Sequence, residues 1–345
     1  MLSSARLEEL LARMPKVRLA VIGDFFLDKY LIIDPDLAEV SLETGLEARQ
    51  VVEIRCSPGA AGTVTNTLGT LGVGAIQAIG VTGDDGQRYE LEAGLRASRV
   101  DTSMLRIDPA RFTPTYTKPM VRRGGVETEL ERLDIKNRRP LSSENEEYVL
   151  SCLARALDAG VNGVIVADQV QEPDCGIVTE RVRAGIEALA DQYPGVVFFA
   201  DSRCRIDRFR RVTIKPNSRE ASVAAFGDPS GEGDLEKAGR AGRMLAERNG
   251  RTVYVTVGAA GVLVCTPSST VHVPAVPVTG PIDIVGAGDS VTAGTVSALC
   301  AGATDTEAAA FGALCSSVTI RKLGTTGTAS PDEVRDALTR AVWPH

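Results

Sequence analysis

The sequence predicts an α/β protein in which a central, mostly parallel sheet lies between two layers of helices. Apolar runs typical of buried parallel strands recur along the chain, and most are separated by stretches with helical periodicity. Strands that alternate with helices need crossover connections, which place helices on both faces of the sheet. The predicted strands are residues 17–23, 75–80, 162–168, 195–201, 211–216 and 251–258.

Two stretches, residues 28–56 and 113–134, do not follow this alternation of buried strands and helices. In them, apolar and polar residues alternate with a period of two. That pattern predicts antiparallel strands with one solvent-facing side, and Gly124 and Gly125 predict a hairpin turn. We expect these strands to form a small antiparallel lid that covers a site on the α/β body.

The composition is that of an ordinary globular protein: 43% of the 345 residues are hydrophobic and 24% are charged. This length allows one large α/β domain or two smaller ones, and we interpret residues 1–345 as a single domain with the lid as a subdomain. A net charge of -7 provides no basic field for nucleic acid. No apolar run approaches the ~18 residues that span a bilayer, and the first 15 residues predict a short amphipathic helix. We therefore expect a cytoplasmic protein without nucleic-acid or membrane partners.

The segment DIVGAGDS at residues 283–290 is the strongest candidate for chemistry. Its small residues Gly286, Ala287 and Gly288 lie between Asp283 and Asp289, directly before a predicted helix. Small residues let backbone amides approach a ligand, and the start of a helix adds its positive dipole end, so the segment predicts an anion hole. Asp289 is placed there to accept a proton from an attacking hydroxyl group. The alternative is a tight strand-to-helix turn that Asp289 caps.

Four further segments accompany this motif in a fixed order. They are VIGDFFLDKY (21–30), PGAAGTVTNTLGTLGVG (from residue 58), IKPNSREA (214–221) and VTVGAAGV (255–262). Together with DIVGAGDS they resemble the signature segments of the ribokinase-like (PfkB-type) carbohydrate kinases, and the resemblance covers nearly the whole chain. It implies a ribokinase-like three-layer α/β/α domain with a β lid, and an ATP- and Mg²⁺-dependent kinase that phosphorylates a hydroxyl of a sugar or sugar phosphate.

The resemblance also implies roles for individual residues. The family binds its sugar at the end of the first strand and at the glycine-rich helix start, which implies substrate contacts for Asp24, Asp28, Gly59, Ala60 and Gly62. The later segments face the nucleotide, which implies ATP contacts for Asn217, Thr256, Gly258 and Gly261, a Mg²⁺ role for Glu220 and a monovalent cation near Asp283. Asp289 would be the general base, with Gly286 to Gly288 as the anion hole.

Several of these positions have a plainer interpretation. Asn217 and Glu220 are three residues apart and could simply cap a helix. Asp28 could start a turn before the lid, and Asp283 could only pin the glycine loop. Asp28 follows the first predicted strand, however, and ligands of open α/β sheets bind at the carboxyl ends of strands.

Within the family, the segments GDFFLDKY, SLETGLEARQVVE and ADSRCRIDRFRRVTIKPNSREA are most similar to the D-glycero-D-manno-heptose-7-phosphate kinase branch. A phosphorylated sugar would need cations in the lid, for which Lys118 and Arg132 are candidates; solvated charge is the alternative. Ala60 and Thr63 stand where the family usually has glycine and asparagine, and residues 167–176 replace a small lysine-containing loop. These differences concern the fit of the sugar. The branch often carries a nucleotidyltransferase domain downstream, and we expect any such activity to come from another polypeptide.

Other classes of protein fit the sequence less well. No Gly-Lys pair provides a Walker-type phosphate loop, and no dinucleotide-binding glycine motif follows the first strand. The histidines, His272 and His345, and the seven scattered cysteines show no zinc-ligand spacing. The remaining alternative is a non-catalytic sugar or nucleotide sensor that retains the kinase fold, although a sensor has no use for a base at Asp289. Exposed lid edges also predict a homodimer through the lid strands.

Overall fold

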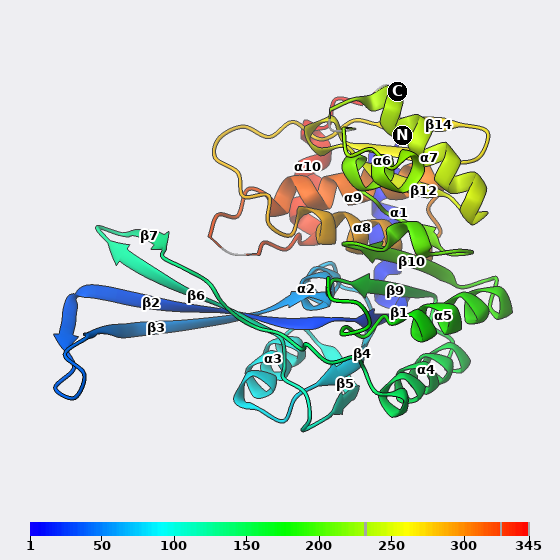
Figure 1. Cartoon of the computed structure of the whole chain (residues 1–345). Coiled ribbons are helices and arrows are strands. Elements are labelled where there is room, and N and C mark those ends of the chain that lie inside the picture. Colours follow the sequence, from blue (N-terminus) through cyan, green and yellow to red (C-terminus); the bar gives the residue numbers. More distant parts are fainter. Residues whose placement is uncertain (231–232, 325, 344–345) are drawn as a thin grey trace.

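A nine-stranded sheet forms the centre of the protein in the computed structural model, which describes residues 1–230, 233–324 and 326–343 (Figure 1). Its strand order is β14-β13-β12-β11-β10-β9-β1-β4-β5. Neighbouring strands from β12 to β5 are parallel, whereas β13 and β14 are added antiparallel at one edge. The strands are β1 (Arg18–Gly23), β4 (Ala75–Thr82), β5 (Val100–Ile107), β9 (Gly163–Asp168), β10 (Val197–Ser202), β11 (Thr213–Ile214), β12 (Val253–Thr256), β13 (Val262–Cys265) and β14 (Thr270–Val273).

Helices cover both faces of this sheet because successive strand residues point to opposite sides. In β1, Leu19 and Val21 pack into one hydrophobic core, and Ala20 and Ile22 pack into the other. The first core is covered by α1 (Ser4–Arg13), α2 (Ala61–Thr70), α3 (Gly86–Ala97), α8 (Ala287–Cys300), α9 (Asp305–Thr319) and α10 (Pro331–Arg340). The second core is covered by α4 (Ser143–Asp158), α5 (Glu180–Gln192), α6 (Ser218–Phe226) and α7 (Leu235–Asn249).

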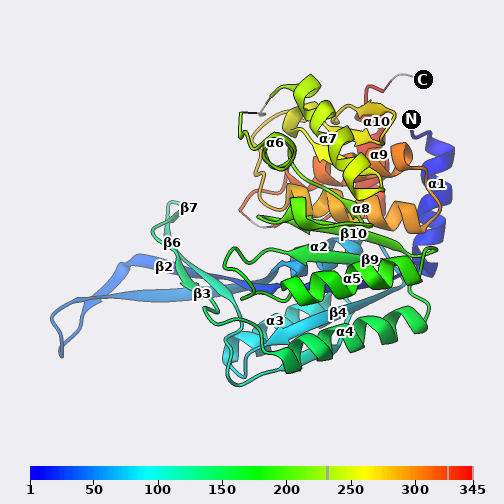
Figure 2. The same ribbon diagram turned by 45° about the vertical axis from the view of Figure 1, so that its right-hand side comes forward.

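A second, smaller sheet projects from the body as a lid (Figures 1 and 2). Its order is β3-β2-β6-β7, and β8 also pairs with β6. All its pairs are antiparallel except β2 with β6, which are parallel. The positive φ angles of Gly124 (55°) and Gly125 (81°) form the predicted turn between β6 and β7. The lid strands are β2 (Phe25–Val40), β3 (Glu47–Ala60), β6 (Thr115–Arg123), β7 (Val126–Glu129) and β8 (Leu133–Ile135).

The predicted fold is confirmed: a mostly parallel sheet lies between helical layers and carries a small lid sheet. Each predicted apolar run overlaps one strand of the large sheet, but β5, β13 and β14 are not predicted. β5 is an edge strand with few buried residues, so it lacks a continuous apolar run. Among the described residues, no helix is long and apolar enough to span a membrane. His345 and part of the predicted loop at 227–234 lie outside the described residues.

Candidate active site

Two helix starts meet at the carboxyl edge of the large sheet. α8 begins directly after the predicted glycine loop, with Gly286 at its N-cap and Asp289 in its first turn. α2 begins where β3 ends, with Ala60 at its N-cap. The two starts are neighbours, since a Cβ added to Gly286 would lie 3.4 Å from Cγ2 of Thr63. Ligands of open α/β sheets bind at this edge.

The N-termini of α2 and α8 lack the capping side chains of the other helices. Among the described α-helices, each of the other eight starts with a side chain that accepts a hydrogen bond from a first-turn amide. These caps are Ser3, Asp85, Ser142, Thr179, Asn217, Asp234, Thr304 and Ser330. Ala60 and Gly286 have no side chain that can accept. The positive dipole ends of α2 and α8 are therefore open to an anion.

One amide of the predicted anion hole is already engaged. The Ala287 amide donates to the Ile284 carbonyl at 3.1 Å, which closes the turn before α8. The amides of Gly288 and Asp289 have no acceptor within the described part of the chain. Of the three predicted residues, Ala287 thus has its amide engaged in the turn, while the amides of Gly288 and Asp289 stay open at the start of α8. The anion-hole roles of Gly286, Ala287 and Gly288 stay a prediction.

The Asp289 carboxyl group is partly buried and makes no ion pair with any described residue. Burial raises its pKa to about 7, and the carboxylates of Asp201 and Asp28 add to this effect, whereas Lys215 and Arg203 oppose it. A carboxyl group with a pKa near 7 can accept a proton from a hydroxyl at neutral pH. The electrostatic influence of Asp28 also indicates that the two predicted carboxylates share one site.

Asp28 reaches this site from within β2, which excludes the alternative that it only starts a turn. Its Oδ1 lies 3.5 Å from Nζ of Lys118. Burial raises the pKa of Asp28, whereas Lys118 and Arg132 lower it. A Cβ at Gly59 would lie 2.4 Å from Oδ2 of Asp28, so a glycine at that position makes room for the carboxylate.

Asp24 has a different environment from Asp28. Its carboxylate is buried and accepts hydrogen bonds from the amides of Gln169 (2.8 Å), Val170 (3.1 Å) and Ile177 (2.8 Å). Burial raises the pKa of Asp24 to about 6, although these amides lower it. The sequence analysis assigns Asp24 to the substrate, but its hydrogen bonds fix the loop after β9.

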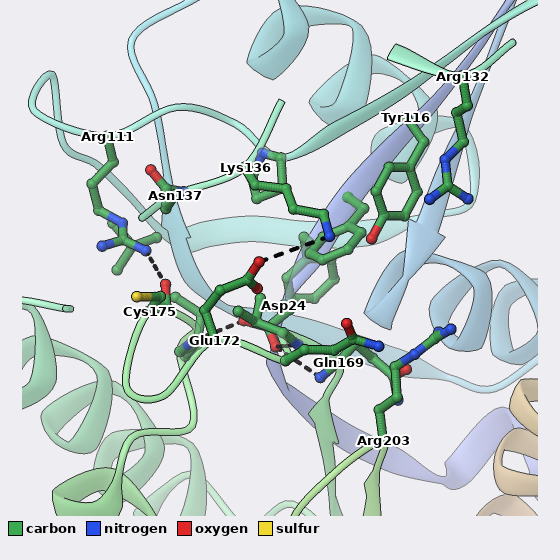
Figure 3. Close-up of a pocket in the computed structure, with 17 residues that line it drawn as sticks. Asp24, Arg111, Tyr116, Arg132, Lys136, Asn137, Gln169, Glu172, Cys175 and Arg203 are labelled. Atoms are coloured by element: carbon green, nitrogen blue, oxygen red, sulfur yellow. Dashed lines mark hydrogen bonds and ion pairs between the residues drawn. The ribbon is translucent and has the colours of Figure 1, made fainter. Parts of the chain in front are cut away.

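A pocket opens beside Asp24, between the base of the lid and the loop after β9 (Figure 3). Arg132 and Lys136 lie over the ring of Tyr116, at 4.5 and 5.9 Å from its centroid. The charged side chains that line the pocket are the cations Arg111, Arg132, Lys136 and Arg203 and the carboxylates Asp24 and Glu172. This excess of positive charge favours an anionic ligand.

The cations of the pocket differ in how far they are neutralised. Arg111 donates to the Cys175 carbonyl at 2.5 Å, and Lys136 lies 3.9 Å from a carboxylate oxygen of Glu172. Arg203 makes no ion pair with the described residues. Its positive charge lowers the pKa of Tyr116 and of Asp289, whereas burial raises both. Arg203 therefore acts electrostatically on a residue of the pocket and on the candidate base.

The predicted ATP-binding residues gather at the ends of β11 and β12. Asn217 and Thr256 form a parallel bridge. The Asn217 side chain accepts from the Glu220 amide, and Glu220 Oε2 accepts from the Asn217 amide, both at 2.8 Å. This is the capping box that the plainer interpretation describes. Gly258 (φ 59°) and Gly261 (φ 108°) form the turn after β12, and a Cβ at Gly261 would collide with backbone 2.2 Å away.

Asp283 holds the loop that leads into α8. Its Oδ1 accepts from the Val285 amide at 3.0 Å, and its own amide donates to the Ile320 carbonyl at 2.8 Å. The interpretation of Asp283 as a residue that pins the loop therefore fits the structure, and its role for a monovalent cation stays a prediction.

Three charged residues near the base are missed by the sequence analysis. Asp201 is at the carboxyl end of β10, and the sequence analysis uses the corresponding place after the first strand as an argument for Asp28. The place of Asp201 in the sequence was therefore a usable signal. Lys215 lies within the predicted segment IKPNSREA, two residues before Asn217. Arg203 gives no signal, because it lies in an irregular segment rich in arginine.

Ala60 adopts a backbone conformation that favours glycine, with φ 54° and ψ -118°. Such a conformation costs an alanine about 1–3 kcal/mol, whereas glycine costs about 0.5–1 kcal/mol through its freedom in the unfolded chain. We expect Ala60→Gly to raise the free energy of unfolding by about 1 kcal/mol in urea titrations. Ala61→Gly, at the first helical position of α2, should lower it; an Ala60→Gly protein less stable than the wild type would contradict the strain.

Comparisons with known proteins agree with this geometry. Residues 212–333 match the family model described as pfkB family carbohydrate kinase. The bifunctional protein HldE of Trichlorobacter lovleyi is 28% identical over 330 residues, and that of Geotalea uraniireducens is 30% identical over 331 residues. Each alignment covers 95% of this chain but 64% of the relative, so the chain spans less than two thirds of these relatives.

Solved structures show the same fold. The ribokinase of Arabidopsis thaliana, complexed with ribose and ATP, superimposes with a TM-score of 0.68 at 17% identity, over 94% of this chain and 99% of that one. Phosphofructokinase-2 of Escherichia coli, in complex with fructose-6-phosphate, gives a TM-score of 0.70 at 17% identity, over 94% and 98%. The chain therefore shares its fold with these kinases. Residues 212–333 are thus similar to the pfkB family of carbohydrate kinases, and nearly the whole chain is similar to HldE proteins of the heptose-phosphate kinase branch.

Proposed function

We propose that this protein transfers the terminal phosphoryl group of ATP to a hydroxyl of a sugar or sugar phosphate, within one kinase domain that spans residues 1–345. The observation that carries the proposal is the environment of Asp289. Its carboxyl group has a raised pKa and lies in the first turn of a helix whose N-terminus no side chain caps. A proton acceptor beside an open anion site is what phosphoryl transfer to a hydroxyl requires.

In the proposed mechanism, the acceptor lies between Asp28 and Asp289. The Asp289 carboxylate takes the proton of the attacking hydroxyl as its oxygen bonds to the γ-phosphorus. The bond from that phosphorus to the β–γ bridging oxygen breaks, and ADP leaves on the opposite side. The amides of Gly288 and Asp289 and the dipole of α8 stabilise the negative charge that develops on the transferred group.

A phosphorylated acceptor, such as a heptose phosphate, is favoured by the basic pocket. Four cations and two carboxylates line it, and one of these carboxylates, Asp24, is satisfied by backbone amides. Arg132 is paired with Asp134 outside the lining, so the other three cations carry the excess of positive charge. The sugar ring would contact Asp28 and the turn at Gly59, Ala60 and Gly62, and its phosphate would enter the pocket. Arg203 is the cation most available to that phosphate, because its guanidinium makes neither an ion pair nor a hydrogen bond with the described residues, whereas Arg111 donates to the Cys175 carbonyl.

ATP would bind along Asn217, Thr256, Gly258 and Gly261. The carboxylates nearby fit Mg²⁺, which prefers oxygen ligands and is usually held by one or two carboxylates together with phosphates and water. Glu220 uses Oε2 in its capping box and keeps Oε1, and Asp201 is close enough to raise the pKa of Glu220. Bound Mg²⁺ would neutralise charge on the phosphates of ATP. Asp283 would lie near a monovalent cation.

A coupled ADP-release assay with ATP and Mg²⁺ tests the proposal against a panel of sugars and sugar phosphates. The rate of ADP release should rise with at least one acceptor of the panel. Phosphorylated sugars should give higher rates than their neutral counterparts. Calorimetry with ATP serves as the parallel measurement. A protein that binds ATP but turns over none of the panel would favour the alternative of a non-catalytic sensor that retains the kinase fold.

The base should give the reaction a characteristic pH dependence. Because the carboxylate form of Asp289 is required and its pKa is about 7, kcat/KM should fall about tenfold per pH unit below that value. The rate profile between about pH 5 and pH 9 measures this, since kcat/KM reports groups of the free enzyme. An acid limb near pH 4, the ordinary range of an aspartate, would contradict the assignment.

The exposed lid supports a homodimer as its assembly state. Val51, Val52 and Ile54 on β3 and Val40 on β2 are large apolar residues on the projecting sheet, with exposures from 43% to 69%. β3 is an edge strand of that sheet, and a second copy of the lid would cover both the edge and these side chains. Light scattering on the purified protein decides the matter: a monomeric mass would remove the dimer.

A further inference from the structure

Lys215 is a buried lysine next to the first turn of α8. It directly follows β11, and its amide donates to the Ala200 carbonyl at 3.0 Å, so the residue lies at the carboxyl edge of the sheet. Lys215 is only 4% exposed. Its Nζ lies 3.5 Å from the position that a Cβ on Gly288 would occupy. The ammonium group is therefore beside the amides that the proposed mechanism assigns to the transferred phosphoryl group.

The ammonium group has more hydrogen-bond donors than partners. It carries three N–H groups, yet its one polar contact among the described residues is Oδ2 of Asp201, at 2.9 Å. Burial by itself would lower the pKa of Lys215, but Asp201, Glu220 and Asp289 together raise it, so the group stays charged. A buried cation with unused donors is costly unless another negative or oxygen-rich group meets it.

Asp201 fixes the position of this ammonium. It lies at the end of β10, and its Oδ2 accepts from Oγ1 of Thr292 on α8 at 3.2 Å. The same hydroxyl lies 3.1 Å from the carbonyl of Gly288. The carboxylate of Asp201 is thus tied to α8 and to Lys215 at once, so the ammonium keeps a fixed distance from the start of the helix.

We propose that Lys215 is a further catalytic residue, which contacts the phosphoryl group during its transfer, and that Asp201 is its positioning residue. This role rests on the proposed function. Lys215 remains protonated throughout: the proton of the acceptor moves to Asp289, and the ammonium adds positive charge where the γ-phosphoryl oxygens become more negative. The competing explanation is that Lys215 only neutralises Asp201.

The test uses Mg·ATP alone, since slow transfer to water needs no identified acceptor. Lys215→Met should lower ADP release by about 10²-fold to 10³-fold, the usual effect of losing one such donor. Its affinity for ADP in calorimetry should stay within about threefold, because the contact forms with the transferred group. Lys215→Arg should restore part of the rate, since it keeps the charge. ADP with aluminium fluoride, which mimics the group in transfer, should bind wild type more tightly than ADP alone and lose that advantage in Lys215→Met.

Two further variants separate the explanations. Lys29→Met removes another lysine that pairs with one carboxylate at 2.9 Å, Glu90, and should leave the rate unchanged. The double variant Asp201→Asn with Lys215→Met removes the ion pair without leaving a buried charge. If Lys215 only neutralises Asp201, the double variant regains the wild-type rate, and the proposal is overturned; we expect it to remain slow. A Lys215→Met protein as fast as the wild type would overturn it too, whereas a wild type that neither binds nor turns over ATP would overturn the proposed function itself.

Discussion

Replacing Asp289 with asparagine lowers kcat by about 10²-fold to 10⁴-fold, the usual contribution of a general base, and leaves ATP binding intact. The amide of asparagine has nearly the same size as the carboxyl group but cannot take the proton of the acceptor. The measurement is ADP release with the best acceptor of the panel, together with calorimetry for ATP. The loss should lie in kcat, because the nucleotide contacts assigned to Asn217 and Thr256 are untouched.

Asp332→Asn is the matched control for this experiment. Asp332 also lies in the first turn of a helix, α10, but its side chain is 91% exposed and pairs with Arg335 on the surface. This variant should keep the wild-type rate. If Asp289→Asn also retained more than about a tenth of the rate, another group would have to act as the base.

Replacing Arg205 with methionine lowers the free energy of unfolding by about 3–5 kcal/mol, because it leaves a buried carboxylate without its partner. Asp168 is fully buried, and Arg205 donates to both of its oxygens, at 2.6 and 3.2 Å. Arg205 also donates to the carbonyl of Gln171 at 3.2 Å, so the loop beside the basic pocket loses an anchor as well. Urea titration followed by circular dichroism measures the loss.

Arg211→Met is the control for this loss of stability. Arg211 pairs with Asp191, but both side chains are on the surface, with exposures of 61% and 42%. Exposed ion pairs contribute about 0–1 kcal/mol, so this variant should change stability by no more than that. Equal losses in the two variants would mean that the burial of Asp168 is not what makes its pairing with Arg205 important.

The order of the elements could be predicted from the sequence because parallel strands leave continuous apolar runs. The same physics explains the omission of β5, an edge strand that buries few residues. The strand predicted at 211–216 is present as β11 but is only two residues long. The turn before α8 was predictable for a local reason, since its small residues adjoin the helix that they begin.

Most charges of the pocket could not be predicted in the same way: Arg132 is a candidate in the sequence, but Arg111, Lys136 and Arg203 are not. Arg111, Arg132, Lys136 and Arg203 meet in one pocket only after the lid, the loop after β9 and the end of β10 come together. No spacing in the sequence encodes that meeting. Asp24 shows the opposite difficulty: it lies four residues before the predicted start of the lid, in the expected place for a ligand, yet backbone amides occupy its carboxylate.

The missing caps of α2 and α8 have a consequence for the thermodynamics of the whole protein. A cap contributes about 1 kcal/mol to a helix, and these two helices forgo it at neighbouring ends. An anion bound at that edge accepts hydrogen bonds from the first-turn amides, which no capping side chain satisfies. Stability and ligand binding are therefore linked, and the ligand-bound protein should have a higher free energy of unfolding than the free protein.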